Sequence, residues 1–505
     1  MGTIVGIDFG TSKSMVSYLR NGAPIIIPDF QDHQSIPSLA MVTPESNIFV
    51  GGDALNHPAR YQINFFTISS IMRLLGKSGV TRWGNLQTYP QEVAALILGR
   101  LRVQAEAYCK EEVTRTVLAV PAHLDINQVW AIKEAAKIAG LEPVRLVDGA
   151  TAAILAYRKV NEKKESLAAV VDFGGGTLDV SLVAYGDGLV EVRATHGDDC
   201  LGGDEFDQAI VDILIENIAR DIGKSVELGP SHKLVLSEAA ARAKIELSSR
   251  LDTRIYIPEF IAATGRYYDL DMSLERGTFE RICDPLFERA KRILQQGLAD
   301  ANLKPSDLDT LLLIGGTSHI PRFRGLVSEV TGLKPSYAPD PATIVAQGAA
   351  ILGGILSGDR RDIILLPAST ASYSYALHRG DRVTRVLSRN TCLPNKTTKT
   401  ISTTSDNQTD LTILLFQGDS EGAQGNILVG EVHLSGLLAT KRGVPKIELT
   451  FDMDTNGTLF VSAAEQGTNK RAGVVIQAPN RLNDEQLGVL GRKVETEIEA
   501  FRQSF

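Results

Sequence analysis

Two short glycine loops contain residues whose types and spacing suit the binding of phosphate and a metal ion. GIDFGTSKS at residues 6–14 and VDFGGGTLD at 171–179 each place an aspartate before bare backbone. Glycine permits positive φ and close approach, so successive N–H groups can converge on phosphate oxygens. Asp8 and Asp172 would repel a bare phosphate but suit one that carries a hard divalent cation. The two loops therefore predict a magnesium nucleotide clamped between lobes.

A third glycine turn supports the same interpretation. LLLIGGTSHIP at 311–321 follows an apolar strand and precedes a helical pattern that ends near Gly332. That context suits a phosphate or nucleoside at a helix start. One glycine loop alone would equally suit an ordinary turn, whereas two repeated loops and a third turn favour a phosphate site. The outer carboxylate of the second loop, Asp179, has two open roles: to reach the metal's water shell or to pin the hairpin.

The elements that must position these loops alternate between strand and helix patterns up to about residue 360. A strand ending in aspartate, a glycine loop and a second strand occur twice, over 3–19 and over 168–185. This internal repeat predicts two similar lobes with their loops facing each other across a cleft. Pro90 predicts a helix start, and Asp125 begins a capping box for a second helix that stops at Gly140.

A second domain is predicted from about residue 368, where Ser, Thr and β-branched residues increase and hairpin turns recur. We expect a nucleotide domain over 1–360, an apolar linker over 361–367 that docks on something in at least one state, and an all-β domain over 368–480. The remainder, 481–505, predicts a short helix with one apolar stripe, formed by Leu487, Leu490, Val494, Ile498 and Phe501.

Composition limits the remaining classes of function. The 505 residues are 43% hydrophobic and 22% charged, which is typical of a soluble globular protein with two or three domains. A net charge of −8 without a basic block argues against nucleic-acid partners. Four cysteines without a CxxC pair indicate buried thiols and a reducing compartment. No signal peptide or membrane span is evident, so we expect a cytoplasmic protein with no membrane partner.

Several motifs along the chain resemble those of a known family. GIDFGTS, AVPA at 119–122, VDFGGGTLD, LGGDEFD at 201–207 and LLIGGTSHIP are similar to the nucleotide-binding domain of the seventy-kilodalton heat-shock chaperones. SRNTCLPNKT, TSDNQ, RGVPKIELTFDMDTNG and LFVSA are similar to their peptide-binding sandwich. The resemblance covers nearly the whole chain. It implies an α/β actin-like ATPase fold with duplicated ribonuclease-H-like lobes, followed by an all-β sandwich and a short C-terminal helix.

The resemblance also implies ligands for individual residues. Asp8 and Asp172 would order the water molecules of a magnesium ion, and Arg145 matches an arginine implicated in linker and J-domain contact. Lys244 and Ser248 match positions that contact the nucleoside. The phosphates of ATP or ADP would be held by Gly10, Thr11, Ser12, Gly174, Gly175, Gly176 and Thr177, and the nucleoside would be bordered by Gly203, Gly315 and Gly316.

The β domain and the linker carry further implied contacts. Ile401, Leu411 and Ile413 match the family's peptide pocket, and core packing is the open alternative for all three. Ile364, Leu365 and Leu366 form the apolar run of the linker, in which Pro367 takes the place of an aspartate that helps to couple the domains. Coupling is therefore expected to be weaker. The long helical lid is reduced to at most residues 484–505, either naturally or because the sequence is truncated.

Departures from the family pattern concentrate at the predicted nucleotide. The family's AKRLIG has a lysine that touches the phosphates and the attacking water, but IMRLLG at 71–76 has Met72. Its NEPTAAA has a glutamate near the metal-bound waters, but this chain has Gly149. Losing one preorganised charge commonly costs about 10²–10³-fold in rate, so we expect slow or absent hydrolysis. Two arginines that sandwich adenine and a nearby glutamate correspond to Ile245, His319 and Ala241.

Lys13, inside the first phosphate loop, is where the family usually has an uncharged residue. It either supplies the cation that Met72 lacks or is a solvated surface lysine. The overall prediction is a chaperone-like magnesium-nucleotide clamp coupled to a domain that binds extended apolar segments of unfolded clients, with a J-domain co-chaperone and a nucleotide-exchange factor as partners. A nucleotide-free pseudo-ATPase acting as scaffold or holdase stays open. So does a small-molecule kinase of the actin-like superfamily, although no catalytic carboxylate base is evident.

Overall fold

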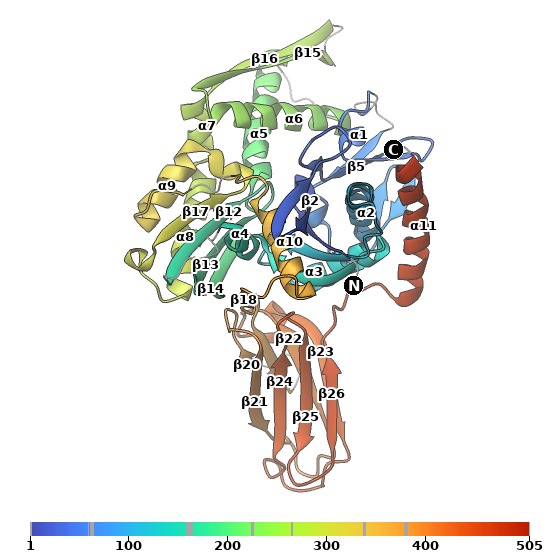
Figure 1. Cartoon of the computed structure of the whole chain (residues 1–505), viewed down its shortest axis with the longest axis vertical. Coiled ribbons are helices and arrows are strands. Elements are labelled where there is room, and N and C mark those ends of the chain that lie inside the picture. Colours follow the sequence, from blue (N-terminus) through green and yellow to red (C-terminus); the bar gives the residue numbers. More distant parts are fainter. Residues whose placement is uncertain are drawn as a thin grey trace.

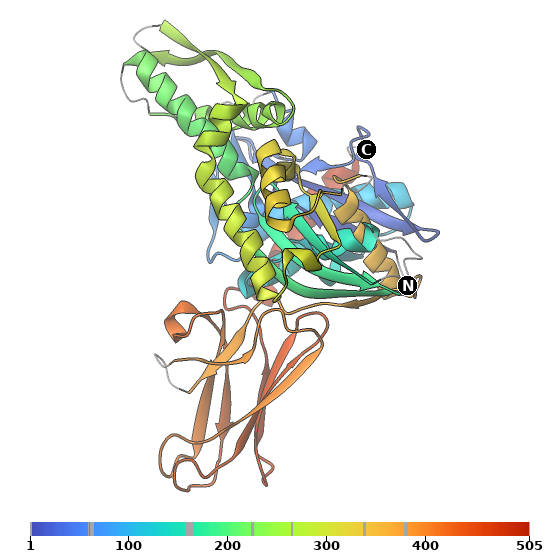
Figure 2. The same cartoon turned by 90° about the vertical axis from the view of Figure 1, so that its left-hand side faces the viewer.

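The computed structural model describes residues 3–58, 60, 65–157, 165–223, 227–263, 266–336, 340–377 and 382–503. Figure 1 shows a two-lobed α/β body, with a β-sandwich extending from one end and the hairpin of β15 (Asp252–Ala263) and β16 (Arg266–Glu275) at the other. Figure 2 shows that both projections run along the long axis of the molecule. Within the described ranges, no helix combines the length and apolarity that a bilayer crossing requires.

Lobe I is built on a mixed sheet in the order β11-β10-β1-β2-β3, with β4 also paired to β2. β1 runs parallel to β10 and antiparallel to β2, so the first glycine loop connects an antiparallel pair. The strands are β1 (Ile4–Phe9), β2 (Lys13–Arg20), β3 (Ala23–Ile27), β4 (Ile36–Pro37), β10 (Arg115–Val120) and β11 (Glu142–Asp148), covered by helices α2 (Pro90–Cys109) and α3 (Ile126–Ile138).

Lobe II repeats this arrangement in the order β17-β12-β13-β14-β18, again with a parallel neighbour on one side of the first strand and an antiparallel neighbour on the other. The repeat predicted from the two aspartate-ended strands is therefore confirmed. The strands are β12 (Ser166–Phe173), β13 (Leu178–Gly186), β14 (Leu189–Asp198) and β17 (Thr310–Ile314), with helices α5 (Gly203–Ile222), α6 (Pro230–Leu247), α7 (Arg276–Ile282), α8 (Asp284–Asp300) and α9 (Pro321–Thr331).

Two helices join the lobes. α4 (Gly149–Tyr157) and α10 (Ile344–Ser357) pack against each other between the two sheets. Their core includes Ile4 and Val117 from the lobe I sheet together with Val170 and Leu312 from the lobe II sheet, all 6% exposed or less. Because apolar side chains of both sheets share one core, the phosphate loops at the strand ends are brought to the same cleft.

Smaller elements complete the upper part of lobe I. They form a three-stranded sheet, a short hairpin and single helical turns beside the cleft. They are β5 (Leu39–Val42), β6 (Ile48–Val50), α1 (Gly52–Leu55), β7 (Phe66–Ser69), the 3₁₀ turn η1 (Ile71–Arg73), β8 (Thr81–Trp83) and β9 (Leu86–Thr88), while lobe II adds the 3₁₀ turns η2 (Pro305–Asp307) and η3 (Gly316–His319).

Local sequence signals placed the helices of lobe I correctly. Pro90 is the first residue of α2, where its missing N–H leaves no intrahelical bond unmade. Asp125 accepts a hydrogen bond from the Gln128 backbone N–H while the Gln128 side chain accepts one from the Asp125 N–H, so the capping box is confirmed. Gly140 follows the end of α3 with φ 74°, the left-handed conformation expected beyond a helix.

The linker docks as a strand. β18 (Ile364–Leu366) pairs in parallel with β14 and extends the lobe II sheet at its edge, as its apolar run predicted. The sandwich that follows has two four-stranded sheets, β20-β19-β22-β23 and β21-β24-β25-β26. Its strands are β19 (Tyr373–Ala376), β20 (Thr384–Leu387), β21 (Asn395–Ile401), β22 (Asp410–Gln417), β23 (Ile427–Ser435), β24 (Ile447–Met453), β25 (Leu459–Glu465) and β26 (Arg471–Val475), with the turn η4 (Ala423–Gly425).

The C-terminal helix returns to lobe I. α11 (Asp484–Gln503) packs on α2 and α3, and in Figure 1 it stands beside α2. Its predicted stripe is confirmed, because Leu490, Val494, Ile498 and Phe501 are 0–8% exposed within the lobe I core. By its packing, the helix therefore belongs to lobe I.

Candidate functional site

The two phosphate loops meet at the cleft between the lobes. A Cβ atom built on Gly175 would lie 1.9 Å from the Ser12 hydroxyl oxygen, and one built on Gly176 would lie 2.7 Å from the Thr11 hydroxyl oxygen. These glycines are required because any side chain would collide with the facing loop. The predicted loops are thus brought together, and in this conformation they are in direct contact.

Other predicted residues converge on the second loop. Gly203 at the start of α5 donates its N–H to the Gly174 carbonyl at 3.0 Å, and the Thr317 hydroxyl donates to the same oxygen at 2.8 Å. Lys244 on α6 donates from Nζ to the Gly203 carbonyl at 2.9 Å and to Asp207 Oδ2 at 2.8 Å. Elements far apart in sequence therefore assemble one site around residues 174–177.

The third glycine turn and the end of α6 border this site. Gly315 has φ 79°, and a Cβ there would lie 2.4 Å from the Phe173 carbonyl. Gly316 begins η3, so this turn opens a 3₁₀ turn before α9 begins at Pro321. The Ser248 hydroxyl donates to the Lys244 carbonyl at 3.2 Å, at the end of α6.

Three aspartates at the cleft have strongly raised pKa values. Burial, then the charge of Asp172, raises the pKa of Asp8 to about 8. Burial, then Asp148, raises the pKa of Asp172 to about 6. Burial, then Asp172, also raises the pKa of Asp179 to about 8, and Asp179 Oδ1 accepts the Ala122 N–H at 3.2 Å. Asp179 thus ties β13 to the loop after β10, and the raised pKa values reflect burial together with the repulsion between neighbouring carboxylates.

The departures from the family pattern have defined places. Met72 is 5% exposed and packs in the lobe I core. A Cβ on Gly149 would lie 2.8 Å from Asp172 Oδ2, so this position does adjoin the predicted metal carboxylate. Lys13 is exposed at the start of β2, and within the described ranges its ammonium group makes no hydrogen bond or ion pair.

The residues at the adenine positions present different chemistry. Ile245 on α6 is 67% exposed, and Ala241 lies one turn before it. His319 Nδ1 lies 2.6 Å from an Nη of Arg324 on α9. Burial, and then the charge of Arg324, lowers the pKa of His319. The sequence identified the substitution at His319 but not its partner Arg324, which lies one helical turn further along.

Arg73 is the functional candidate that the sequence did not reveal. Directly after Met72, it crosses the cleft and donates from two nitrogens to Glu205 at 2.6 and 2.8 Å and to the Gly176 carbonyl at 3.0 Å. The arginine of IMRLLG is visible in the sequence, but its partners Gly176, in the second loop, and Glu205, on α5, lie more than a hundred residues away. Only the packing of the lobes brings them together.

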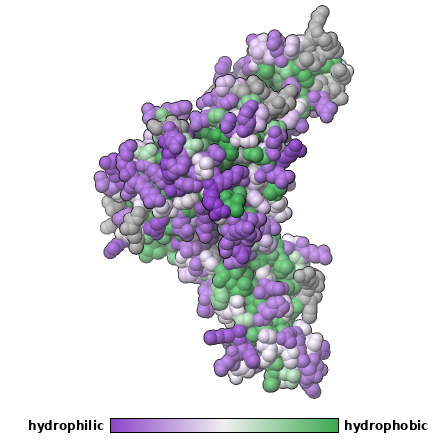
Figure 3. Space-filling model, turned by 90° about the vertical axis from the view of Figure 1, so that its right-hand side faces the viewer, coloured by the Kyte–Doolittle hydropathy of each residue, from purple (hydrophilic) through white to green (hydrophobic). Residues whose placement is uncertain are grey.

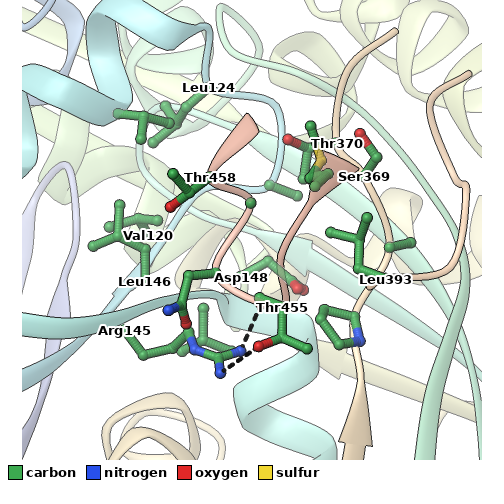
Figure 4. A pocket seen from close by; sticks show the side chains of 18 of the residues that line it. Val120, Leu124, Arg145, Leu146, Asp148, Ser369, Thr370, Leu393, Thr455 and Thr458 are labelled. Atoms are coloured by element: carbon green, nitrogen blue, oxygen red, sulfur yellow. Dashed lines mark hydrogen bonds between the residues drawn. The ribbon is translucent and has the colours of Figure 1, made fainter. Parts of the chain in front are cut away.

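A cavity of about 180 Å³ lies where lobe I, the linker and the sandwich meet (Figure 4). Its wall includes Arg145, which donates to the Thr455 carbonyl at 2.8 Å, and Asp148, which accepts the Thr151 N–H at 2.8 Å. Leu365 of the linker also lines it, whereas Ile364 is 63% exposed. The predicted interdomain residues Arg145 and Leu365 therefore lie at one junction.

The three residues matched to a peptide pocket are inside the sandwich. Ile401, Leu411 and Ile413 are 7%, 2% and 0% exposed and pack in the core between its two sheets. In this conformation they make the core contacts that the sequence left as an alternative. Residues 378–381, between β19 and β20, lie outside the described residues.

Comparison with protein families agrees with the geometry. The chain matches the family described as Hsp70 protein over residues 4–82 and 78–503, which together span nearly its whole length. The duplicated lobes, the paired glycine loops and the attached sandwich are compatible with that assignment. The chain therefore belongs to the Hsp70 family of chaperones, whose members have a nucleotide-binding domain.

Proposed function

We propose that this chain is a chaperone whose cleft binds a magnesium nucleotide, ATP or ADP, and whose sandwich binds extended apolar peptide segments. The observation that carries the proposal is the meeting of two glycine loops from two lobes beside the buried pair Asp8 and Asp172. The backbone N–H groups and hydroxyl groups of the two loops can donate hydrogen bonds to phosphate oxygens. A divalent cation would balance the negative charge of Asp8 and Asp172.

The side chains around the cleft suit magnesium. The raised pKa values of Asp8 and Asp172 mean that both carboxylates ionise together only at a cost, which a divalent cation would remove. Among the described residues, no three acidic, His or Cys side chains gather closely enough to hold a metal alone. Magnesium suits this arrangement, because it keeps several waters and binds through one or two carboxylates and phosphate oxygens. Asp8, Asp172 and the glycine loops can therefore hold a magnesium ion with its phosphate once the two loops separate.

Each predicted residue has a role in that complex. Asp8 and Asp172 hold the hydrated ion, and Thr11, Ser12 and Thr177 add hydroxyl donors to the backbone of the glycine loops. The ion would neutralise phosphate charge and orient the terminal phosphate. Nucleoside contacts fall to Gly203, Lys244, Ser248, Gly315 and Gly316.

Hydrolysis is proposed to be slow or absent. Met72 supplies no charge and lies in the lobe I core, and Gly149 has no side chain to orient a water beside Asp172. Among the residues that the structure describes, no hydrogen bond or ion pair directs the exposed ammonium group of Lys13 to the second loop. Phosphoryl transfer depends on such positioned groups, so binding without rapid turnover is expected.

Peptide binding is supported by the exposed apolar surface of the sandwich. Figure 3 shows hydrophobic side chains among hydrophilic ones on this domain, most densely where it meets the lobes. Leu438 and Val444, in the connection between β23 and β24, are 68% and 59% exposed. Such side chains suit an extended apolar segment, with Ile401, Leu411 and Ile413 accessible only if the sandwich opens.

Calorimetric titration with ATP and ADP, with and without Mg²⁺, tests the proposal, together with single-turnover hydrolysis. We expect magnesium-dependent binding, at least tenfold weaker in Asp172→Asn, and little product. Ser357→Ala, on α10 away from the loops, is the control and should bind normally. No heat of binding to the wild-type chain would refute the nucleotide proposal.

A second candidate is a nucleotide-free scaffold or holdase. The direct contact of Ser12 with Gly175 and of Thr11 with Gly176 favours it, because phosphate cannot lie between loops that touch. The same titration separates the two: a scaffold would bind a fluorescent apolar peptide without binding ATP or ADP, and its peptide affinity would not respond to either nucleotide.

A further inference from the structure

The cavity between lobe I, the linker and the sandwich has walls from three parts of the chain (Figure 4). Its volume is about 180 Å³, and lobe I lines it with residues of α3 and β11. The linker adds Leu365, and the sandwich adds the turn between β24 and β25, at residues 455–458. A molecule bound in this cavity would therefore contact all three parts at once.

Most of the side chains around the cavity are apolar. They come from all three parts of the wall and include Leu124, Trp130, Leu146, Leu365, Met453 and Ile476. Such walls favour the transfer of an apolar group from water into the cavity. An apolar cavity of roughly 150 Å³ is large enough for benzene, so this one suits an aromatic ring or a short alkyl chain.

Two cations interrupt the apolar walls. Lys133 of α3 and Arg145 of β11 both line the cavity, and Arg145 donates to the uncharged Thr455 carbonyl at 2.8 Å. Among the described residues, the buried Nε of Arg145 has no hydrogen-bond acceptor, and neither cation forms an ion pair. Burial lowers the pKa of both groups, and the charge of Asp454 opposes this shift in each. Because the same carboxylate acts on both, the two cations lie at one end of the cavity.

The carboxylates near this end are already engaged. Asp454 Oδ1 accepts the N–H groups of Asn456 and Thr458, each at 2.8 Å, which keeps it with its own turn. Asp148 lines the cavity, but its two oxygens accept the N–H and the hydroxyl of Thr151. Burial also raises the pKa of Asp148, which favours its uncharged form. The described residues therefore balance the positive charge at this end only in part.

We propose that the cavity binds a small amphipathic carboxylate, whose charged group bonds to Lys133 and Arg145. Its apolar body lies against Trp130 and Leu365. Both cations gain a partner in a partly enclosed site, where charge-assisted hydrogen bonds are strong. The bound molecule stabilises the attachment of the sandwich, because it binds only the conformation in which lobe I, the linker and the sandwich meet. The proposal does not depend on nucleotide binding.

Calorimetric titration of the full chain with phenylpropionate, without nucleotide, tests the proposal. We expect saturable binding at one site per chain. Phenylpropionamide has nearly the same shape without the charge, and it should bind at least about tenfold more weakly, since it lacks the charge-assisted bonds. No saturable binding of phenylpropionate, or equal affinities for the acid and the amide, would overturn the proposal.

Two lysines of α3 provide a matched pair of variants. Lys133→Met keeps the apolar stem and removes the charge inside the cavity, so the affinity for phenylpropionate should fall about tenfold or more. Lys137→Met removes an exposed charge one turn further along the same helix and should bind as the wild type does. Equal affinities in the two variants would place the acid elsewhere and overturn the assignment.

Two measurements on the wild type locate the ligand even where Lys133→Met is unstable. Emission from Trp130, which lines the cavity, should change at the same concentrations as the heat of binding, and this change should be lost in Trp130→Phe. The Ile364 N–H donates to the Gly188 carbonyl at 2.7 Å, and its hydrogen exchange should slow when the acid is bound. Saturable heat without a change in Trp130 emission would overturn the site, and unchanged exchange at Ile364 would overturn its effect on attachment.

Discussion

At the scale of single residues, the cleft combines groups that suit nucleotide binding with groups that do not suit hydrolysis. Asp8 and Asp172 provide buried carboxylates with raised pKa values, whereas Gly149 beside Asp172 provides no side chain. The type of residue at position 72 does not by itself say which side chain reaches the cleft. The Met72 side chain packs in the lobe I core, and the neighbouring Arg73 contacts the second loop.

Restoring a lysine at Met72 should not restore catalysis. Met72→Lys would place an ammonium group in an apolar core, at a cost of about 2–4 kcal/mol in the free energy of unfolding. Urea unfolding followed through Trp83, which is 1% exposed in the same core, measures the loss in a Trp130→Phe background. Met72→Leu is the control. Rapid single-turnover hydrolysis by Met72→Lys at undiminished stability would contradict this prediction.

His123 should make the protein less stable in mild acid. Burial lowers its pKa to about 4 from 6.5, so the unfolded chain binds the proton more tightly than the folded one. Stability from this group is complete above pH 6.5 and declines as the pH falls towards 4, by about 1.4 kcal/mol per pH unit.

The measurement is the thermal unfolding midpoint at pH 7 and pH 5. The wild type should lose more than His123→Gln over this interval, by the equivalent of about 2 kcal/mol. His433→Gln, on the exposed face of β23, is the control and should behave as the wild type does. Equal losses in the wild type and His123→Gln would show that His123 does not cause the acid sensitivity.

At the scale of elements, the linker strand β18 and the C-terminal helix α11 lie outside the predicted nucleotide domain in sequence, but they pack as parts of the two lobes. β18 extends the lobe II sheet, and α11 fills a groove on lobe I beside α2. A Cβ on Gly99 of α2 would lie 2.6 Å from the end of Ile498, so that glycine makes room for the helix. Lys493 pairs with Glu92, and Arg502 donates to Glu106 at 2.9 Å.

Ile498→Ala should therefore destabilise lobe I. Ile498 is fully buried between α11 and α2, and truncating such a side chain costs about 2–4 kcal/mol. Val489→Ala removes a side chain of the same helix that is 51% exposed, and it should cost much less. Urea unfolding reported by Trp83 compares them. Equal effects of the two substitutions on lobe I would mean that α11 is not part of its core.

At the scale of the whole molecule, the sandwich is attached to both lobes. On lobe I, the Ile126 N–H donates to the Gln417 side chain at 2.9 Å. On lobe II, the Thr195 N–H donates to Asn390 at 2.9 Å, and Arg389 pairs with Asp300. A change in the angle between the lobes must therefore strain or release these contacts, which gives the cleft a mechanical route to the sandwich.

Arg389→Ala should weaken this attachment. Asp300 would lose a partner in a largely enclosed ion pair, at a cost of about 1–3 kcal/mol to docking. Trp130 packs against the sandwich core, so its emission should shift to longer wavelength as docking weakens, while Trp83 stays buried. Arg382→Ala breaks a fully exposed pair with Glu421 and is the matched control. An unchanged spectrum in Arg389→Ala would argue that the pair does not hold the domains together.

Short-range sequence signals were enough to predict the local elements and the glycine loops. Alternating apolar strands, Pro90 at a helix start and the capping box at Asp125 depend on neighbouring residues only, and their predictions agree with the structure. The two aspartate-ended strands also predicted the duplicated lobes, because one pattern occurs twice. The family motifs supplied the residues that border the cleft, and the third glycine turn correctly preceded a helix.

Long-range packing, by contrast, sets which side chains reach the cleft and which elements share a core. It packed Met72 into the lobe I core, and it brought Arg73 to Glu205 across 132 positions of sequence. It also joined α11 to lobe I. These outcomes depend on how two lobes pack and on which apolar surfaces remain to be covered. Periodicity within a segment carries no information about a partner that is distant in the chain.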